Sequence, residues 1–561
     1  MCGIFAVTGS EDDSVELIYK SLRKLAYRGY DSAGIASVMD TGDIKELKTL
    51  GHPEELKFNL LKSKNASIGH NRWATHGGIT LVNTHPHYSS NGDIAVVHNG
   101  IIDNYEELKK KYDIECYSQT DTEIIPKLIE KFYTGSNELE AIKKTIDLLD
   151  GTFALAIIFS FKPSTVWAAK RGSPLAIGHE EGWKNWHVSS DATIFGRNIV
   201  AQTLLEENEI VELTAGKNIV SNNIGPRVFK DNIENEDKDD AGCAMRREIF
   251  EQEESIKRAI WSRIRFDEST TYFNGIGNFP IPSRIVMIAC GSSYNAALYG
   301  KYLIEEKTNI PVEVTIASEL SYIDDKATYF VLSQSGETYD VIAAVKEIKR
   351  KGVKELYAIV NRVGSTIATM CSKGIYLHAG KETAVAATKS FTAQCIVLHG
   401  LAIHLARRID KDSKWGNEEL SKLRSLSYSM VMAEFDNSMV QHIYNSHFLV
   451  ILGSGPNYAL ALEGALKIKE ICYIPCETAP VGEIKHGPLA LISHNTPVII
   501  LGKHPSTASE VAARGGKVYT FNDNLILPNI FQLQLLTMEL AEKKGLNIDR
   551  PRNLAKCVTT K

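Results

Sequence analysis

The chain has 561 residues, of which 43% are hydrophobic and 23% are charged, and its formal net charge is -5 at pH 7. This length exceeds what one hydrophobic core normally supports, so we expect roughly two to four domains of ordinary globular composition. The negative balance argues against nucleic acid as the principal partner. No apolar run reaches the length of about 18 residues that crosses a bilayer, and the start, Met-Cys-Gly-Ile-Phe, lacks the basic region of a signal peptide.

The nine cysteines are scattered along the chain, and no two of them are spaced as C-x-x-C. This pattern favours a reducing compartment over a disulfide scaffold. We therefore expect a cytoplasmic protein.

The first part of the chain mixes helical and strand patterns. Residues 15–25 and 122–132 have the periodicity of amphipathic helices, whereas residues 94–97 and 152–159 are short apolar runs typical of strands. These patterns predict a layered α/β domain over residues 2–225. Residues 231–240 are nearly all polar and cannot bury enough apolar surface to order themselves, so we place a linker at residues 226–245.

Cys2 becomes the N-terminal residue if Met1 is removed, which the small side chain of Cys2 permits. It then carries a nucleophile and a base together, because an α-amine with a pKa of about 8 can accept the thiol proton and return it to a leaving amine. A cysteine at position two can also be an accident. The hypothesis therefore depends on the segments that follow.

Five polar segments follow, at residues 27–34, 70–77, 84–87, 97–100 and 120–123. Their side chains suit free glutamine as a ligand. Its α-carboxylate fits a forked guanidinium such as that of Arg72, and its α-ammonium fits a carboxylate such as that of Asp121. Its amide oxygen needs donors as it becomes an oxyanion, and the Asn99 side chain and the Gly100 backbone can supply them.

In this order after M-C-G-I, the segments resemble the class II glutamine amidotransferase domain, an N-terminal-nucleophile hydrolase with a four-layer αββα fold. The resemblance implies that Cys2 is the nucleophile, that Asn99 and Gly100 form the oxyanion hole, and that Trp73 gates an ammonia passage. It also implies a set of glutamine-binding residues: Arg72, Trp73, Thr75, His76, His85 and Asp121.

The five histidines between residues 70 and 98 have a rival interpretation as a metal site, since imidazole is a common metal ligand. No acidic or thiol ligands accompany them at recognisable spacing, so we expect no metal. Arg28 and Asp31 form either an internal ion pair or a part of the substrate site, and the sequence leaves both open.

After the linker, apolar runs end at small residues and lead into helical segments, as in parallel α/β units. Residues 284–289 lead into G-S-S-Y-N, and residues 448–452 lead into G-S-G-P-N. This repeat predicts two doubly wound α/β subdomains, over residues 280–415 and 445–545. The last segment, residues 549–561, is either a frayed tail or a functional one.

A polar loop stands between the apolar run 328–332 and the helical segment 341–349, and it contains Ser333, Gln334, Ser335 and Thr338. Hydroxyls and unpaired N–H groups at a helix start make an anion cradle, which Ser292 and Ser293 would complete. The same hydroxyls can also be simple caps. No P-loop or dinucleotide fingerprint is present, so we expect no nucleotide and no cofactor.

The helical segment 459–471 places Glu463, Lys467 and Glu470 on one face. Such a stripe is either a set of solvated ion pairs or a functional cluster. His486, on an expected loop over residues 482–488, can divide acid and base work with Glu470.

These motifs, together with the terminal P-R-N-L-A-K-x-V-T, resemble the sugar isomerase (SIS) domains of the glutamine:fructose-6-phosphate aminotransferase family. The resemblance spans essentially the whole chain. It implies that L-glutamine and D-fructose 6-phosphate become L-glutamate and D-glucosamine 6-phosphate, the first step toward UDP-N-acetylglucosamine, with ammonia passed internally. SIS domains generally pair, so the resemblance also implies a homodimer.

The same resemblance implies individual roles. Lys556 would form a Schiff base with the open-chain ketone, His486 would assist ring opening, and Glu470, helped by Lys467, would move a proton between C1 and C2. Val385 would lie near the sugar. The phosphate would be held by Ser292, Ser293, Ser333, Gln334, Ser335 and Thr338.

Two rival functions stay open. Another class II amidotransferase would need a phosphoribosyltransferase or pyrophosphate-binding half, and neither motif is present. A sugar-phosphate-binding regulator would not need Cys2, Glu470, His486 and Lys556 together. The chain lacks the long insertion typical of the animal and yeast enzymes, and Cys557 stands where serine is more familiar.

Overall fold

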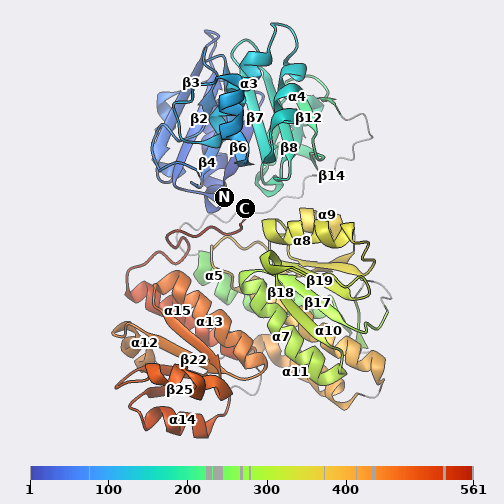
Figure 1. The fold of residues 1–561 in the computed structure, drawn as a ribbon, viewed down its shortest axis with the longest axis vertical. Helices are drawn as coiled ribbons and strands as arrows, with labels where there is room; N and C mark the ends of the chain where they lie inside the picture. The colour runs from blue at the N-terminus through green and yellow to red at the C-terminus, as the bar shows by residue number, and fades with distance from the viewer. Residues whose placement is uncertain are drawn as a thin grey trace. The chain divides into compact units, whose positions relative to one another are not determined.

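The computed structural model describes residues 2–74, 76–222, 230–231, 244–265, 270–273, 275–276, 280–371, 373–411, 413–431, 437–521 and 526–558. The chain divides into two compact units, the first comprising Met1–Lys238 with Cys557–Lys561 and the second comprising Asp239–Lys556. Figure 1 draws most of the first unit in blue to teal and the second in green to red. None of the described helices is long and apolar enough to cross a membrane.

The first unit contains two antiparallel sheets. Their strand orders are β14-β11-β9-β10-β1-β4-β2-β3 and β13-β12-β8-β7-β6-β5. In chain order the strands are β1 (Gly3–Val7), β2 (Ser32–Val38), β3 (Ile44–Leu50), β4 (Ser67–Arg72), β5 (His87–Tyr88), β6 (Ile94–Ile102), β7 (Gly151–Phe159), β8 (Thr165–Arg171), β9 (Ala176–Glu180), β10 (Trp186–Ser189), β11 (Ile199–Leu204), β12 (Ile210–Thr214), β13 (Val220–Ser221) and β14 (Lys230–Asp231).

Alternating side chains pack these two sheets against each other and against helices. Residues such as Ile4 of β1 and Val97 of β6 share one buried cluster between the sheets. The other face of the larger sheet packs on α1 (Ser14–Lys24), and the other face of the smaller sheet packs on α3 (Ile124–Phe132) and α4 (Glu138–Leu148). This arrangement confirms the predicted four-layer αββα fold.

The predicted helices of this unit form close to their expected places. Helix α1 begins at Ser14 because the Asp13 carboxylate accepts the N–H of Val15 at 2.9 Å, a cap typically worth about 1 kcal/mol. The pattern over residues 122–132 forms a short 3-10 turn, η4 (Asp121–Glu123), followed by α3. A further helix, α2 (Tyr105–Tyr112), follows β6.

The second unit contains two parallel sheets, with strand orders β18-β17-β19-β20-β21 and β23-β22-β24-β25. The strands are β17 (Ile285–Ala289), β18 (Val312–Ile316), β19 (Thr328–Ser333), β20 (Leu356–Val360), β21 (Gly374–Tyr376), β22 (Leu449–Gly453), β23 (Cys476–Pro480), β24 (Pro497–Leu501) and β25 (Lys517–Phe521). A separate short hairpin pairs β15 (Ile264–Arg265) with β16 (Thr270–Thr271).

Helices cover both faces of each parallel sheet. The helices of this unit are α5 (Ala244–Phe250), α6 (Gln252–Trp261), α7 (Gly291–Thr308), α8 (Tyr339–Arg350), α9 (Thr366–Cys371), α10 (Lys389–Ile409), α11 (Lys414–Val431), α12 (Asn437–Tyr444), α13 (Pro456–Cys472), α14 (Pro505–Ala512) and α15 (Pro528–Lys543). On the first sheet, Met287 faces the cluster that contains α7 and α10, whereas Val286 faces α8 and α9. On the second sheet, Ile451 faces α13 and α15, whereas Val450 faces α14. Both sheets are therefore doubly wound, as predicted.

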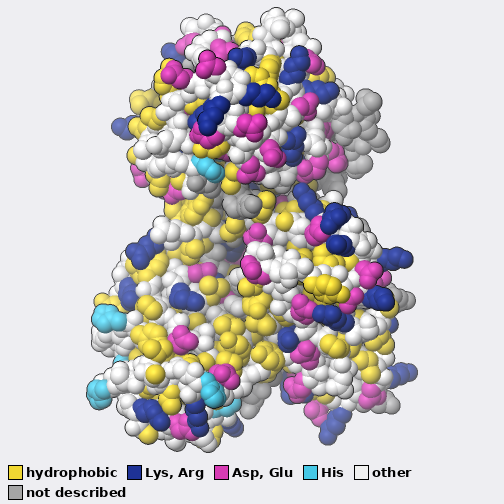
Figure 2. Space-filling view, in the orientation of Figure 1, with side chains coloured by type: hydrophobic (Ala, Val, Ile, Leu, Met, Phe, Trp, Pro, Cys, Tyr) yellow, Lys and Arg dark blue, Asp and Glu magenta, His cyan; other side chains and the backbone are white. Residues whose placement is uncertain are grey.

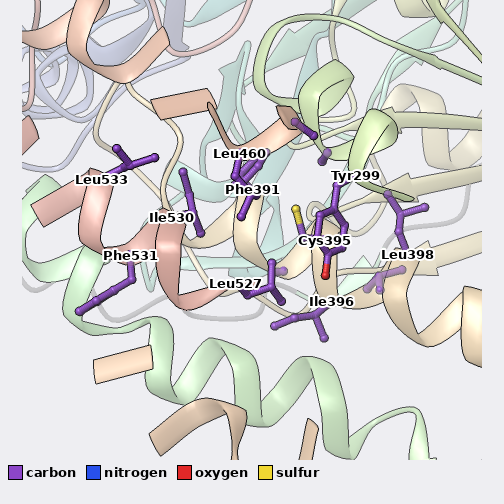
Figure 3. Close-up of a cluster of buried hydrophobic side chains, with 14 of the residues drawn as sticks. Tyr299, Phe391, Cys395, Ile396, Leu398, Leu460, Leu527, Ile530, Phe531 and Leu533 are labelled. Atoms are coloured by element: carbon purple, nitrogen blue, oxygen red, sulfur yellow. The ribbon is translucent and has the colours of Figure 1, made fainter. Parts of the chain in front are cut away.

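One hydrophobic cluster joins the helices of the two parallel sheets. It contains Tyr299 of α7, Phe391 of α10, Leu460 of α13 and Phe531 of α15, all of them buried. Figure 3 shows these side chains gathered between the four helices. Full burial of each large apolar side chain contributes about 1.5 to 3 kcal/mol, so the shared core makes the two sheets one unit.

Two predicted segments differ from expectation or fall outside the described residues. Most of the linker predicted at residues 226–245 lies outside the described residues, except β14 and the start of α5. The loop expected over residues 482–488 consists mainly of two 3-10 turns, η8 (Val481–His486) and η9 (Pro488–Leu491). The domain limits themselves stay predictions.

On the face drawn in Figure 2, Lys and Arg lie interspersed with Asp and Glu over both units.

Candidate active sites

Cys2 stands immediately before the first strand of the larger antiparallel sheet. Its Sγ accepts the Trp73 N–H at 3.3 Å and donates to the Trp73 carbonyl at 3.6 Å. Burial raises the pKa of the Cys2 thiol, which the Trp73 amide and the Arg72 guanidinium oppose. The thiol therefore needs a base before it can attack.

Asn99 and Gly100 lie beside Cys2 on β6. The Asn99 side-chain N–H donates to the Cys2 carbonyl at 2.9 Å, while its Oδ1 lies 3.1 Å from Nε2 of His70. Gly100 has φ of +144°, and a Cβ there would lie 2.0 Å from the Thr152 carbonyl oxygen, so a side chain is excluded. The structure thus brings Asn99 to Cys2, the predicted nucleophile, and Gly100 follows Asn99 on β6.

Arg72 and Asp121 are both buried in the same unit. The Arg72 guanidinium donates to the carbonyls of His76 at 2.6 Å, Gly77 at 3.2 Å and Gly78 at 3.0 Å, so it fixes the loop that follows Trp73. The Asp121 carboxylate accepts the Ile102 N–H at 2.7 Å. Burial lowers the pKa of Arg72, and the charges of Cys2, Asp31 and Asp121 oppose this shift.

The rest of the predicted glutamine set is more dispersed. Trp73 is half-buried and packs edge-on against Tyr30, with ring centroids 6.0 Å apart. His76 is half-buried and contacts Tyr105. Thr75 lies outside the described residues.

His85 belongs to a buried histidine cluster. Its ring stacks on His70 at 4.0 Å, and its Nε2 lies 3.0 Å from the Thr122 hydroxyl, which His98 approaches at 2.9 Å. Burial lowers the pKa values of all three imidazoles. Among the described residues, no group of three or more His, Cys, Asp or Glu side chains is placed to hold a metal ion.

Arg28 and Asp31 each have another partner. Arg28 lies 3.6 Å from the Asp191 carboxylate. Asp31 instead accepts the Ala74 N–H at 2.8 Å and so fixes the segment that follows Trp73. A role of either residue in the substrate site stays a prediction.

The polar loop after β19 gathers three hydroxyls. The Ser333 hydroxyl lies 2.9 Å from that of Thr338 and 3.5 Å from that of Ser335, and it accepts the Gly336 N–H at 3.0 Å. Thr338 directly precedes α8 but makes no side-chain cap, which argues against the simple-cap interpretation. The half-buried Gln334 shares this loop.

Ser292 and Ser293 occupy the first turn of α7, directly after β17. Strands β17 and β19 are parallel neighbours, so their carboxyl ends bring these serines to the same sheet edge as the loop after β19. The Ser293 hydroxyl accepts from Gln394 at 2.9 Å, and the Ser292 hydroxyl accepts from Lys467 at 3.2 Å. This last contact joins the first turn of α7 to α13.

The stripe on α13 is a buried cluster. Lys467 Nζ lies 3.4 Å from Glu463 and 2.6 Å from Glu470, and the three side chains are 1%, 0% and 22% exposed, respectively. Although burial disfavours the ammonium, the two carboxylates raise the pKa of Lys467 above its ordinary value. The interpretation as solvated ion pairs is therefore wrong.

His486 and Lys556 have contrasting surroundings. His486 is exposed on η8, and no hydrogen bond joins it to Glu470 or Lys556 within the described residues. Lys556 is paired with the buried Glu382 carboxylate. Val385, three residues after Glu382, donates its N–H to the Asp549 carbonyl at 3.0 Å, so the segment beyond α15 docks beside it.

Sequence reasoning missed Glu382, which stands in the same K-E-T-A-V segment as Val385. Its charge, directly before the small and apolar residues 383–387, was an available signal. Its partner Lys556, however, lies 174 residues away in sequence.

Comparison with known proteins assigns a family. The SIS domain model matches residues 282–404 and 442–526, and the glutamine amidotransferase domain model matches residues 79–196. Curated proteins named glutamine–fructose-6-phosphate aminotransferase [isomerizing] match over 100% of both chains, with 36% identity in Clostridium acetobutylicum and 37% in Bacteroides thetaiotaomicron and Aquifex aeolicus. This chain belongs to that family of enzymes.

A solved structure supports the same assignment for the second unit. The C-terminal domain of glucosamine-fructose-6-phosphate aminotransferase from Francisella tularensis superposes with a TM-score of 0.51 at 29% identity. The match covers 56% of this chain and 100% of that chain. The predicted combination of an amidotransferase domain and SIS domains is thereby confirmed.

Proposed function

We propose that this aminotransferase converts D-fructose 6-phosphate and L-glutamine to D-glucosamine 6-phosphate and L-glutamate, with the residues described above in named roles. One observation carries the proposal most directly. The buried Glu463–Lys467–Glu470 cluster contacts Ser292, at the edge that carries the phosphate loops. A module that only sensed sugar phosphate would have no need of a buried carboxylate and lysine at this place.

In the first unit, Cys2 attacks the glutamine amide carbon after removal of Met1. Its α-amine takes the thiol proton and delivers it to the departing ammonia, and water then hydrolyses the thioester to glutamate. The Asn99 amide and the Gly100 N–H stabilise the oxyanion, as their position beside Cys2 suggests. Arg72 and Asp121 bind the α-carboxylate and the α-ammonium, with contributions from Thr75, His76 and His85, while Trp73 gates the passage of ammonia.

In the second unit, the sugar phosphate binds to Ser292, Ser293, Ser333, Gln334, Ser335 and Thr338, with Val385 beside the sugar. His486 assists ring opening, and Lys556 forms an imine at C2 with loss of water. Ammonia displaces the lysine, and Glu470 moves a proton from C1 to C2. Lys467 supports Glu470, because its ammonium lies 2.6 Å from that carboxylate.

The cell location and assembly complete the proposal. Six cysteines of the described residues are free thiols, which fits the reducing cytoplasm predicted from the spacing of the cysteines: Cys2, Cys116, Cys290, Cys395, Cys472 and Cys476. A homodimer that pairs through the parallel-sheet unit is proposed from the general behaviour of SIS domains.

Incubation with glutamine and fructose 6-phosphate tests the function, with mass detection of an amino-sugar phosphate. Wild-type protein should make glucosamine 6-phosphate, and borohydride should trap fructose 6-phosphate on Lys556. Lys556→Arg should give neither result, because a guanidinium stays protonated and is a poor nucleophile. Glutamate release without any amino sugar would contradict the proposal.

A further inference from the structure

Lys556 is held by a carboxylate that has no assigned role. The side chains of Lys556 and Glu382 are 5% and 0% exposed, and the ammonium donates to Glu382 Oε2. Glu382 is itself fixed from the other side. Its carboxylate accepts the N–H groups of Thr388 and Ser390, each at 3.0 Å, and the Ser390 hydroxyl at 2.7 Å.

The charge state of Glu382 follows from these contacts. Although burial disfavours the carboxylate, the Lys556 ammonium and the Ser390 donors lower the pKa of Glu382 to about 2. The carboxylate is therefore ionised as long as Lys556 is an ammonium. Five hydrogen-bond donors, counting Lys556 and the Thr388 hydroxyl at 3.5 Å, share its two oxygens and leave it little freedom to turn away.

A second buried carboxyl, that of Glu248 on α5, contacts the segment that follows Glu382, but it accepts hydrogen bonds mainly from the backbone of that segment. Its Oε1 accepts the N–H groups of Thr383 at 2.5 Å and Ala384 at 3.2 Å. Burial and the nearby Glu382 charge raise the pKa of Glu248 to about 7. Within the described residues, its Oε2 is buried and accepts no hydrogen bond, so Glu382 is the carboxylate that pairs with Lys556.

We infer that Glu382 is the counter-ion of the Lys556 nitrogen throughout imine formation, an inference that rests on the proposed Schiff base at Lys556. The ammonium passes one proton to the Glu382 carboxylate, and the freed amine forms the C–N bond to C2 of the open-chain ketone. The Glu382 carboxyl returns the proton as the carbinolamine C–O bond breaks and water leaves. Ammonium plus ketone thus gives iminium plus water, and one positive charge faces Glu382 before and after.

Burial explains why this counter-ion matters. An uncompensated positive charge in a site shielded from water is strongly disfavoured, so both the ammonium and the iminium depend on Glu382. Glu382→Gln keeps the size of the side chain but removes the charge. Glu382→Ala also removes the charge and leaves space that a small carboxylate can fill.

The test measures the rate of borohydride trapping of fructose 6-phosphate on full-length protein. Glu382→Gln and Glu382→Ala should be trapped at least about a hundredfold more slowly than wild type. Sodium formate should restore trapping in Glu382→Ala and not in Glu382→Gln. The matched control is Glu253→Ala, because Glu253 pairs with the half-exposed Lys257 at 2.8 Å in the same unit without touching Lys556. The control should stay within about threefold of wild type.

Calorimetric binding of fructose 6-phosphate to each variant shows whether the second unit is folded. Two results would overturn the assignment of Glu382 as the counter-ion. One is a wild-type trapping rate in Glu382→Gln, and the other is slow trapping in Glu382→Ala that formate does not speed up. Failure to trap the wild type at all would contradict the proposed function first and this inference with it.

Discussion

The two candidate sites handle protons by different physical means. Around Cys2, burial lowers the pKa values of His70, His85 and His98, so the imidazoles stay neutral and serve as hydrogen-bonding supports. In the second unit, full charges are buried in pairs, Lys467 with two carboxylates and Lys556 with Glu382. A nucleophile that carries its own amine needs only donors for an oxyanion, whereas imine chemistry and a C1-to-C2 proton shift need fixed opposite charges.

The largest effect should come from removing the proposed nucleophile of the first site. Cys2→Ala should lower glutamine hydrolysis at least about a thousandfold, because no other group there can form the thioester. Sugar-phosphate binding and isomerisation should persist, since they belong to the second unit. Glutamate release and fructose 6-phosphate isomerisation, measured on the same preparation, separate the two sites. Full hydrolysis by protein whose intact mass retains Met1 would contradict the α-amine base.

Breaking the charge pairs of the second site should come next. Lys467→Met leaves Glu463 and Glu470 without their cation, which should cost about 3 to 5 kcal/mol of stability and abolish isomerisation. Lys469→Met is the matched control, because Lys469 is exposed on the same helix. Thermal unfolding and isomerase rates compare the two variants. Equal behaviour would mean that the buried cluster has no special role.

A smaller effect should follow from removing one hydroxyl of the proposed phosphate-binding loop after β19. Ser335→Ala removes one hydroxyl from the loop after β19, and a hydrogen bond to a charged group is worth about 1.5 to 3 kcal/mol. Affinity for fructose 6-phosphate should fall about tenfold or more, while glutamine hydrolysis stays unchanged. Ser318→Ala, at an exposed serine of the same unit, should bind normally. Calorimetry that finds equal affinities for both variants would remove Ser335 from the cradle.

The smallest effect concerns the stability of the first unit against unfolding at acid pH. Although burial opposes ionisation, Lys127 and the amides of Ser118 and Tyr117 lower the pKa of Glu123 from 4.5 to about 2. A lowered carboxyl pKa gives stability that is present above pH 4.5 and lost as the pH falls toward about 2. Glu123→Gln should therefore be less stable than wild type at pH 7. Its stability should also change less than that of wild type as the pH falls from 4.5 to about 2. Calorimetric unfolding at a series of pH values checks this prediction, and Glu106→Gln, at an exposed residue, is the control. Identical curves of stability against pH for Glu123→Gln and wild type would contradict it.

The sequence predicted the fold class and the local geometry of each motif, because apolar periodicity and helical spacing are local properties. The i, i+4 and i+7 spacing placed Glu463, Lys467 and Glu470 on one face but did not reveal their burial, since the contacts that cover them come from Ser292 and Asn295 of a distant helix. The Lys556–Glu382 pair was out of reach for the same reason. His85 was expected at the substrate, and its stacking on His70 depends on strands and loops that only the fold brings together.

The most direct test of the whole account follows nitrogen from glutamine to sugar. Protein is supplied with fructose 6-phosphate, glutamine labelled with 15N at the amide, and an excess of unlabelled ammonium. The account predicts glucosamine 6-phosphate that carries 15N, and no 15N-labelled product from Cys2→Ala under the same conditions. Product that carries unlabelled nitrogen, or glutamate release without any amino sugar, would contradict the proposal that the two sites act as one enzyme.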